Sequence, residues 1–200
     1  APDPEPEPAP DPDPEPVPEQ PDPSEDAAEK LASDTLASMT LEEKLWQLFF
    51  VTPESLTGYP KVTEAGPATE EAIGLKPVGG LIYFAQNLED RDQVVQMLTG
   101  VQGFSRIPLF LGVDEEGGTV SRVGSNPAMG AQEFPSAQSL GEQADPAAVY
   151  QAGQDIGGTL HAIGFNMDFA PVADVSSGTS AVIGSRSFGT DPQLCASLVS

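Results

Sequence analysis

Acidic residues follow two apolar segments of the sequence. The segment IPLFLGV (107–113) is followed by Asp114, two glutamates and two glycines, and the segment FNMDFAPVADV (165–175) places Asp174 near its end. Adjacent carboxylates after a buried strand are costly to fold around unless solvent, a cation or a hydroxyl-rich ligand meets them. An ionised Asp is a natural partner for a pair of sugar hydroxyls, and a solvated acidic turn that caps a helix is the alternative.

Two arginines lie in glycine-containing segments, Arg122 in GGTVSRV and Arg186 in IGSRSFG. Each could clamp a carboxylate or sugar oxygens with two parallel hydrogen bonds, and each could equally be a structural partner of the acidic turn. His161 and Cys195 are the only residues of their types. They predict no disulfide, metal or cofactor, and His161 is interpreted as a packing or surface residue of a helix.

Strands and helices alternate along residues 24–200. Continuous apolar runs predict strands at 49–52, 78–85, 107–113 and 165–175, and apolar residues at helical spacing predict helices at 24–39, 41–48, 88–102, 146–163 and from 192 onward. Such alternation is typical of an α/β fold with a parallel sheet covered by helices. No glycine-rich dinucleotide turn follows a strand, and a complete (β/α)8 barrel usually needs about 250 residues. About four of eight strands are therefore expected, the N-terminal half of a TIM barrel.

Residues 1–23 alternate proline with acidic and small residues, which excludes helix and sheet and predicts a disordered, acidic tether. The chain carries a net charge of −23, with 31 acidic and 8 basic residues. Part of this charge lies in the tether, but the rest of the chain is also acidic, so nucleic acid is not an expected partner. No apolar run approaches the roughly 20 residues of a membrane span.

Several strings together resemble glycoside hydrolase family 3, in particular its β-N-acetylglucosaminidase (β-hexosaminidase) branch. They are MTLEEKLWQL, GGLIYF, IPLFLGVDEEGGTVSRV, GFNMDFAPVADV and IGSRSFGTDP, in this order. The resemblance covers about residues 31–200. It implies that Asp114, Arg122 and Arg186 line the first sugar subsite and that Asp174 shapes the pocket.

The resemblance also implies the reaction, which is hydrolysis of terminal β-linked N-acetylglucosamine from cell-wall or chitin-type oligosaccharides, as in peptidoglycan recycling. A retaining mechanism is expected, with an Asp nucleophile and a His acid/base. The string K-H-F-P-G-H-G that would carry this His does not occur here, so both catalytic residues are expected beyond Ser200 and the fragment alone is expected to be inactive. A non-catalytic carbohydrate-binding protein and a β-glucosidase or β-xylosidase of the same family are the alternatives.

The tether predicts a bacterial protein that is secreted or held at the cell surface, with an upstream lipid or cell-surface anchor. A cytoplasmic protein is the alternative. The expected partner is a glycan that contains N-acetylglucosamine.

Overall fold

The computed structural model describes residues 23–177, 180 and 182–200, in two compact units that divide after Met39. In the first unit, helix α1 (Pro23–Ser38) carries an ion pair one turn apart, between Lys30 Nζ and Asp34 Oδ2 at 2.6 Å. The predicted disordered segment 1–23 lies outside the described residues except for Pro23, which begins α1. Among the described helices, none is both long and apolar enough to cross a membrane.

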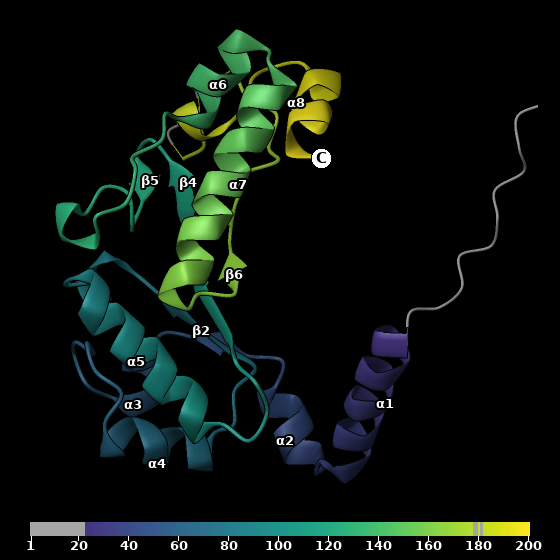
Figure 1. Cartoon of the computed structure of the whole chain (residues 1–200), viewed down its shortest axis with the longest axis vertical. Helices are drawn as coiled ribbons and strands as arrows, with labels where there is room; N and C mark the ends of the chain where they lie inside the picture. The colour runs from purple at the N-terminus through teal and green to yellow at the C-terminus, as the bar shows by residue number, and fades with distance from the viewer. Residues whose placement is uncertain (1–22, 178–179, 181) are drawn as a thin grey trace, which may run out of the picture. The chain divides into compact units, whose positions relative to one another are not determined.

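The second unit, residues 40–200, is built on a parallel four-stranded sheet (Figure 1). Its strands, in spatial order, are β1 (Phe50–Val51), β2 (Gly80–Tyr83), β3 (Phe110–Val113) and β6 (Met167–Asp168). Phe50 pairs with Gly80, Gly80 with Phe110, and Val113 with Asp168. All four predicted strands form, but β6 is shorter than the predicted segment 165–175. Pro171, which has no N–H for a ladder bond, lies three residues after its end.

Each helix of this unit begins at a recognisable sequence signal. Thr40 and Glu43 form the expected capping box, and Asp145 and Gly164 bound the longest helix as predicted. The helices are α2 (Leu41–Trp46), α3 (Pro53–Thr57), α4 (Pro67–Leu75), α5 (Arg91–Phe104), α6 (Ala137–Gln143), α7 (Pro146–Ile163) and α8 (Pro192–Val199), with short 3-10 helices η1 (Ala85–Asn87), η2 (Pro127–Met129) and η3 (Gly184–Arg186). Helices α3 and α4 lie in the segment 53–77, for which the sequence predicted no element.

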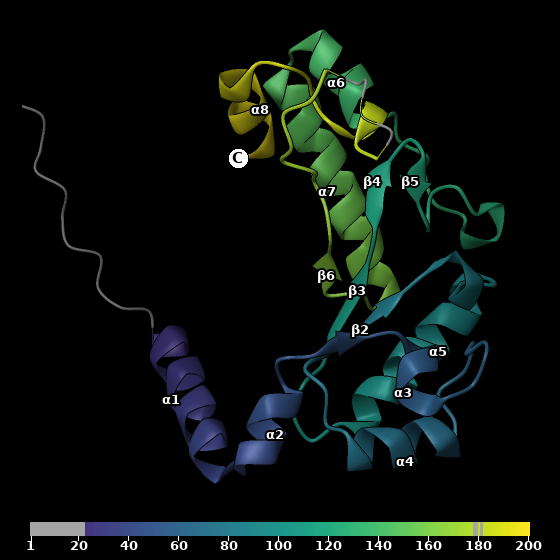
Figure 2. The same ribbon diagram turned by 180° about the vertical axis from the view of Figure 1, so that it is seen from behind.

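The helices α4, α5 and α7 cover one face of the sheet. Their buried apolar residues join those of β2 and β3 in one core, which contains Ile73, Leu81, Tyr83, Val94, Met97, Leu98, Val101, Leu111, Val113, Leu160 and Ile163. Figure 2 shows β2, β3 and β6 side by side from behind. Burial of this face removes the apolar strand surface from water and fixes the carboxyl ends of the strands relative to one another.

The opposite face of the sheet carries an aromatic cluster that is partly exposed. Phe50 of β1 lies 5.8 Å, between ring centroids, from both Phe110 of β3 and Phe169 after β6. Glycine at two strand positions leaves room for these rings, because a Cβ would lie 2.3 Å from Phe50 Cε1 at Gly80 and 2.6 Å from Phe169 Cε2 at Gly112. The helix predicted at 41–48 ends at Trp46, and its predicted apolar face of Leu41, Leu45 and Leu48 is exposed.

A small hairpin follows β3 directly. It consists of β4 (Glu115–Gly117) and β5 (Val120–Ser121), which pair antiparallel with an irregular register. Glu115 and Glu116, for which the sequence offered an acidic turn as the alternative to a ligand site, therefore begin a strand at the carboxyl end of the sheet.

Candidate functional site

Asp114 lies at the carboxyl end of β3, between the central sheet and the hairpin. Its Oδ2 is 3.3 Å from Nη2 of Arg122, which follows β5. The Arg122 guanidinium in turn lies over the ring of Phe84, 5.8 Å from the centroid, at the end of β2. These three side chains bring together the ends of two neighbouring strands and the hairpin, as expected for polar residues that follow parallel strands.

Glu116 and Arg186 form a second, tighter pair. Arg186 Nε donates to Glu116 Oε2 at 2.8 Å, and Arg186 Nη2 donates to Glu116 Oε1 at 2.7 Å. The Glu116 side chain is only 6% exposed and that of Arg186 29%. The hydrogen bonds that Arg186 donates to Glu116 raise the pKa of the Arg186 guanidinium above its ordinary value, and the carboxylates of Asp114 and Asp174 add to this. This pair ties η3 to the hairpin across 70 residues of sequence.

Glu115 points into the hairpin and is buried. Its carboxylate accepts hydrogen bonds from Ser121 Oγ, from the Val123 N–H at 2.6 Å and from the Gly124 N–H at 3.2 Å. The bonded groups lie on both sides of Arg122 in the sequence. Glu115 therefore fixes the main chain that carries Arg122.

Asp168 ends β6 and reaches back to the hairpin. Its Oδ1 accepts a hydrogen bond from the Glu115 N–H at 2.9 Å. The pKa of the Asp168 carboxyl is raised to about 7, mainly because the group is buried. The hydrogen bond from the Glu115 N–H opposes this rise, and the nearby carboxylates of Glu115, Asp114 and Glu116 contribute to it. Asp168 is thus partly protonated near neutral pH.

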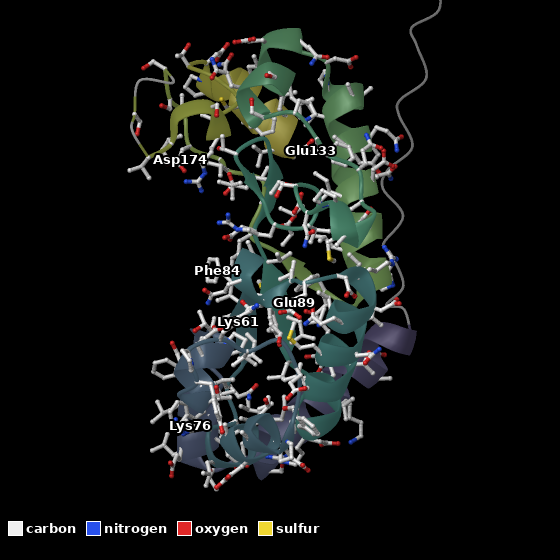
Figure 3. All side chains as sticks on the ribbon, turned by 90° about the vertical axis from the view of Figure 1, so that its left-hand side faces the viewer. Lys61, Lys76, Phe84, Glu89, Glu133 and Asp174 are labelled. Atoms are coloured by element: carbon white, nitrogen blue, oxygen red, sulfur yellow. The ribbon has the colours of Figure 1, made fainter. Side chains whose placement is uncertain are left out.

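Asp174 is exposed, in a segment without regular secondary structure. Its carbonyl oxygen accepts a hydrogen bond from Ser187 Oγ at 2.6 Å, which places Asp174 beside the residue after Arg186. Figure 3 shows Phe84 and Asp174 along the same edge of the view. Asp174 acts on the site through its charge on Arg186 and through this main-chain bond.

The structure therefore brings Asp114, Arg122 and Arg186 to one end of the sheet through two ion pairs. Sequence reasoning assigned no role to three residues that build this arrangement: Phe84, Asp168, and Glu115 as a buried acceptor. Asp168 carried a usable signal, because it is the one charged residue within the apolar run FNMDFAP. His161 is exposed on α7.

A cavity of about 570 Å³ borders the acidic residues on the side of α7 and α8. Glu115, Glu116 and Asp168 lie at its border, and most of its lining is apolar, including Val149, Ile156, Phe188 and Leu198. Within the described part of the chain, no group of three or more His, Cys, Asp or Glu residues is arranged to hold a metal ion.

Comparison with known proteins identifies the family of the chain. Residues 40–200 match the family model described as "Glycosyl hydrolase family 3 N terminal domain". The chain belongs to glycoside hydrolase family 3. The resemblance inferred from the sequence is confirmed, and so is the α/β fold, which matches the TIM-barrel-like N-terminal domain of this family.

Two solved family 3 structures share this fold. A family 3 β-N-acetylglucosaminidase from Paenibacillus sp. str. FPU-7 superposes with a TM-score of 0.72 at 33% identity, over 81% of this chain and 30% of that one. A family 3 glycosyl hydrolase from Mycobacterium smegmatis has a TM-score of 0.66 at 30% identity, over 82% of this chain and 46% of that one.

A curated relative, the β-hexosaminidase of Bordetella avium, is 38% identical over 127 residues, which is 60% of this family 3 chain and 35% of the relative. The chain thus spans between about a quarter and a third of the length of the curated relatives that it matches.

Proposed function

We propose that this family 3 domain supplies the first sugar subsite of a β-N-acetylglucosaminidase, which removes terminal β-linked N-acetylglucosamine from an oligosaccharide. The observation that carries the proposal is the Asp114–Arg122 pair at the carboxyl end of β3, the end at which barrels of this kind bind their ligands. The names of the similar proteins, β-hexosaminidase and β-N-acetylglucosaminidase, support the choice of sugar.

Asp114 has the chemistry to accept hydrogen bonds from sugar hydroxyls. Its contact with Arg122 uses one carboxylate oxygen and one guanidinium nitrogen at 3.3 Å, so the second oxygen of Asp114 is left for a hydroxyl donor. The Asp114 side chain is 19% exposed, which admits a ligand and still excludes most of the water. A hydrogen bond from a hydroxyl to such a carboxylate is stronger than one between neutral groups.

The proposed reaction retains the configuration of the sugar. A carboxylate nucleophile attacks the anomeric carbon while an acid/base residue protonates the leaving oxygen, and water then hydrolyses the glycosyl-enzyme. We assign the Asp nucleophile and the His acid/base to chain that follows Ser200. The described residues hold one histidine, His161, which is exposed on α7 and belongs to no motif of the site.

The proposed substrate is a cell-wall or chitin-type oligosaccharide, and the proposed location is outside the cell or at the cell surface. The composition of residues 1–23 supports this location, because alternating prolines and acidic residues suit an extended spacer between a domain and an anchor.

The test is an assay of the intact natural protein on matched aryl β-glycosides. We expect kcat/KM for the N-acetylglucosaminide to exceed that for the glucoside by about a hundredfold or more, because a polar site rejects an analogue that lacks a required hydrogen-bonding group. Equal turnover of the two would refute the branch assignment. Absence of a His-bearing and an Asp-bearing loop in the reading frame after Ser200 would refute the enzymatic function and favour a carbohydrate-binding protein.

A further inference from the structure

Both peptide groups that flank Asp114 are bonded to β6 and the residue after it. On one side, the Val113 carbonyl accepts a hydrogen bond from the Phe169 N–H at 2.9 Å. On the other side, the Glu115 N–H donates to Asp168 Oδ1 at 2.9 Å. The register pairs Val113 with Asp168, so the Asp168 side chain extends the ladder by one step beyond the last backbone bond.

The contact that the Asp114 side chain itself makes fixes its direction less than the two main-chain hydrogen bonds do. Its ion pair with Arg122 is a single contact of 3.3 Å, near the upper limit for a hydrogen bond. The direction in which Asp114 points is therefore set mainly by the main chain on its two sides. Of the two bonds that hold this main chain, only the one at the Glu115 N–H depends on a side chain.

A buried carboxylate at position 168 destabilises the fold unless it also makes a specific contact. The carboxylates of Asp114, Glu115 and Glu116 lie close enough to Asp168 for their charges to raise its pKa. On the side of α7 and α8, the described residues that line the adjoining cavity include no Lys, Arg or His, and Tyr150 is the titratable residue there. An apolar side chain would avoid the repulsion, but it would leave the Glu115 N–H without its acceptor.

We infer that Asp168 is a positioning residue for sugar binding, which orients Asp114 through its hydrogen bond to the Glu115 N–H. This inference rests on the proposed function. Asp168 does not touch the sugar; it fixes the peptide group that follows Asp114, so that the Asp114 carboxylate faces the subsite before the sugar arrives. Its loss is expected to weaken binding, because the carboxylate must then be ordered at the expense of binding energy.

The test compares D168N, D168L and the exposed control D155A in the intact natural protein, with an aryl N-acetyl-β-glucosaminide as substrate. Asparagine keeps the acceptor oxygen and leucine removes it at similar volume. We expect D168N to keep KM within about threefold of wild type, and D168L to raise KM by about tenfold or more with a smaller change in kcat. Amide exchange of Glu115, measured in the same intact protein, should quicken in D168L and stay slow in D168N and D155A.

Two results would overturn the inference. One is a wild-type KM in D168L together with fast amide exchange at Glu115. This result would show that the bond from the Glu115 N–H to Asp168 stabilises the fold without affecting sugar binding. The other is equal loss of affinity in D168N and D168L, which would show that charge acts rather than the acceptor. If D168L fails to fold, D168E takes its place, because glutamate shifts the acceptor oxygen by one methylene. We expect D168E to raise KM, and a wild-type KM in D168E would contradict the inference. Failure of the proposed function is distinguishable, because it appears as absence of hydrolysis by the wild type.

Discussion

Arg186 holds Glu116 through two parallel hydrogen bonds, from Nε to Oε2 at 2.8 Å and from Nη2 to Oε1 at 2.7 Å. The two residues lie 70 positions apart, and the side chain of Glu116 is only 6% exposed. A planar guanidinium fits a carboxylate in this geometry, and an ammonium group does not. The pair links η3, in the segment after β6, to the hairpin beside the candidate site.

Removal of Arg186 is expected to destabilise the domain. R186A leaves the Glu116 carboxylate buried without its cation, which typically costs about 3 kcal/mol, and R186K should recover only part of the loss because it cannot form both bonds. Urea unfolding of the 200-residue chain measures the difference. K61A is the matched control, since the Lys61–Glu89 pair is about half exposed on both sides, and its loss should cost less than about 1 kcal/mol. Equal effects of R186A and K61A would contradict this prediction.

The sequence predicted the parallel sheet well, because strands covered by helices are continuous apolar runs of the type seen at β2 and β3. It did not predict α3 and α4. Both are short helices that begin at a proline, in a stretch whose glycines and prolines also suit a loop. Their stability comes from packing, through Leu56 and Ile73, and packing cannot be read from local propensity.

The candidate site was only partly predictable for a related reason. The types of Asp114, Arg122 and Arg186 marked them as polar residues after strands, but the sequence could not say which carboxylate each arginine meets. That choice depends on the register of the hairpin, which places Glu115 inward and leaves Asp114 and Glu116 to the arginines. The sequence predicted no role for Asp168, because its neighbours Met167 and Phe169 are typical of an apolar strand.

Substitution of Asp114 is expected to affect sugar binding much more than folding. In the intact natural protein, D114A should lower kcat/KM for an aryl N-acetyl-β-glucosaminide by about thirtyfold or more, since hydrogen bonds to a charged group are worth about 1.5–3 kcal/mol each. D114N, which keeps one acceptor, should lose less. D155A on the exposed side of α7 is the control for an Asp-to-Ala change. Unchanged kinetics in D114A, with wild-type circular dichroism, would refute the role of Asp114.

Asp168 should make stability depend on pH. Its pKa is raised from 3.8 to about 7, so between these values the unfolded chain has released a proton that the folded chain retains. The folded state then binds more protons, and stability falls as the pH rises through this window and levels off above about 7. D168N removes the titration. The difference in unfolding free energy between D168N and wild type should therefore grow in favour of D168N from about pH 4 to about pH 7, as measured by urea unfolding.

The control for this pH dependence is D155N, the same Asp-to-Asn change at an exposed position of α7. A difference between D168N and wild type that stays constant across the window would show that Asp168 titrates in the folded chain as it does in the unfolded one.

Glu115 should hold the main chain on both sides of Arg122. E115Q replaces one of its acceptor oxygens by an NH2 group that faces N–H donors, so we expect a loss of about 1–3 kcal/mol. Amide exchange at Val123 and Gly124 should quicken, because both amides donate to this carboxylate. S121A removes one donor and leaves both amides bonded, and it serves as the control. Slow exchange at both amides in E115Q would show that the hairpin is held by other contacts.

Replacement of Gly112 in β3 by a residue with a side chain is expected to destabilise the domain. An added Cβ would lie 2.6 Å from Phe169 Cε2, so G112A must displace this ring from the aromatic cluster, which is expected to cost about 1–3 kcal/mol. Gly158 in α7 is the matched control, because nothing lies within 4 Å of its added Cβ. G158A should stabilise the helix by about 0.5–1 kcal/mol. Urea unfolding of both variants tests the difference in sign, and a stabilising G112A would mean that the aromatic cluster does not constrain the open face of the sheet.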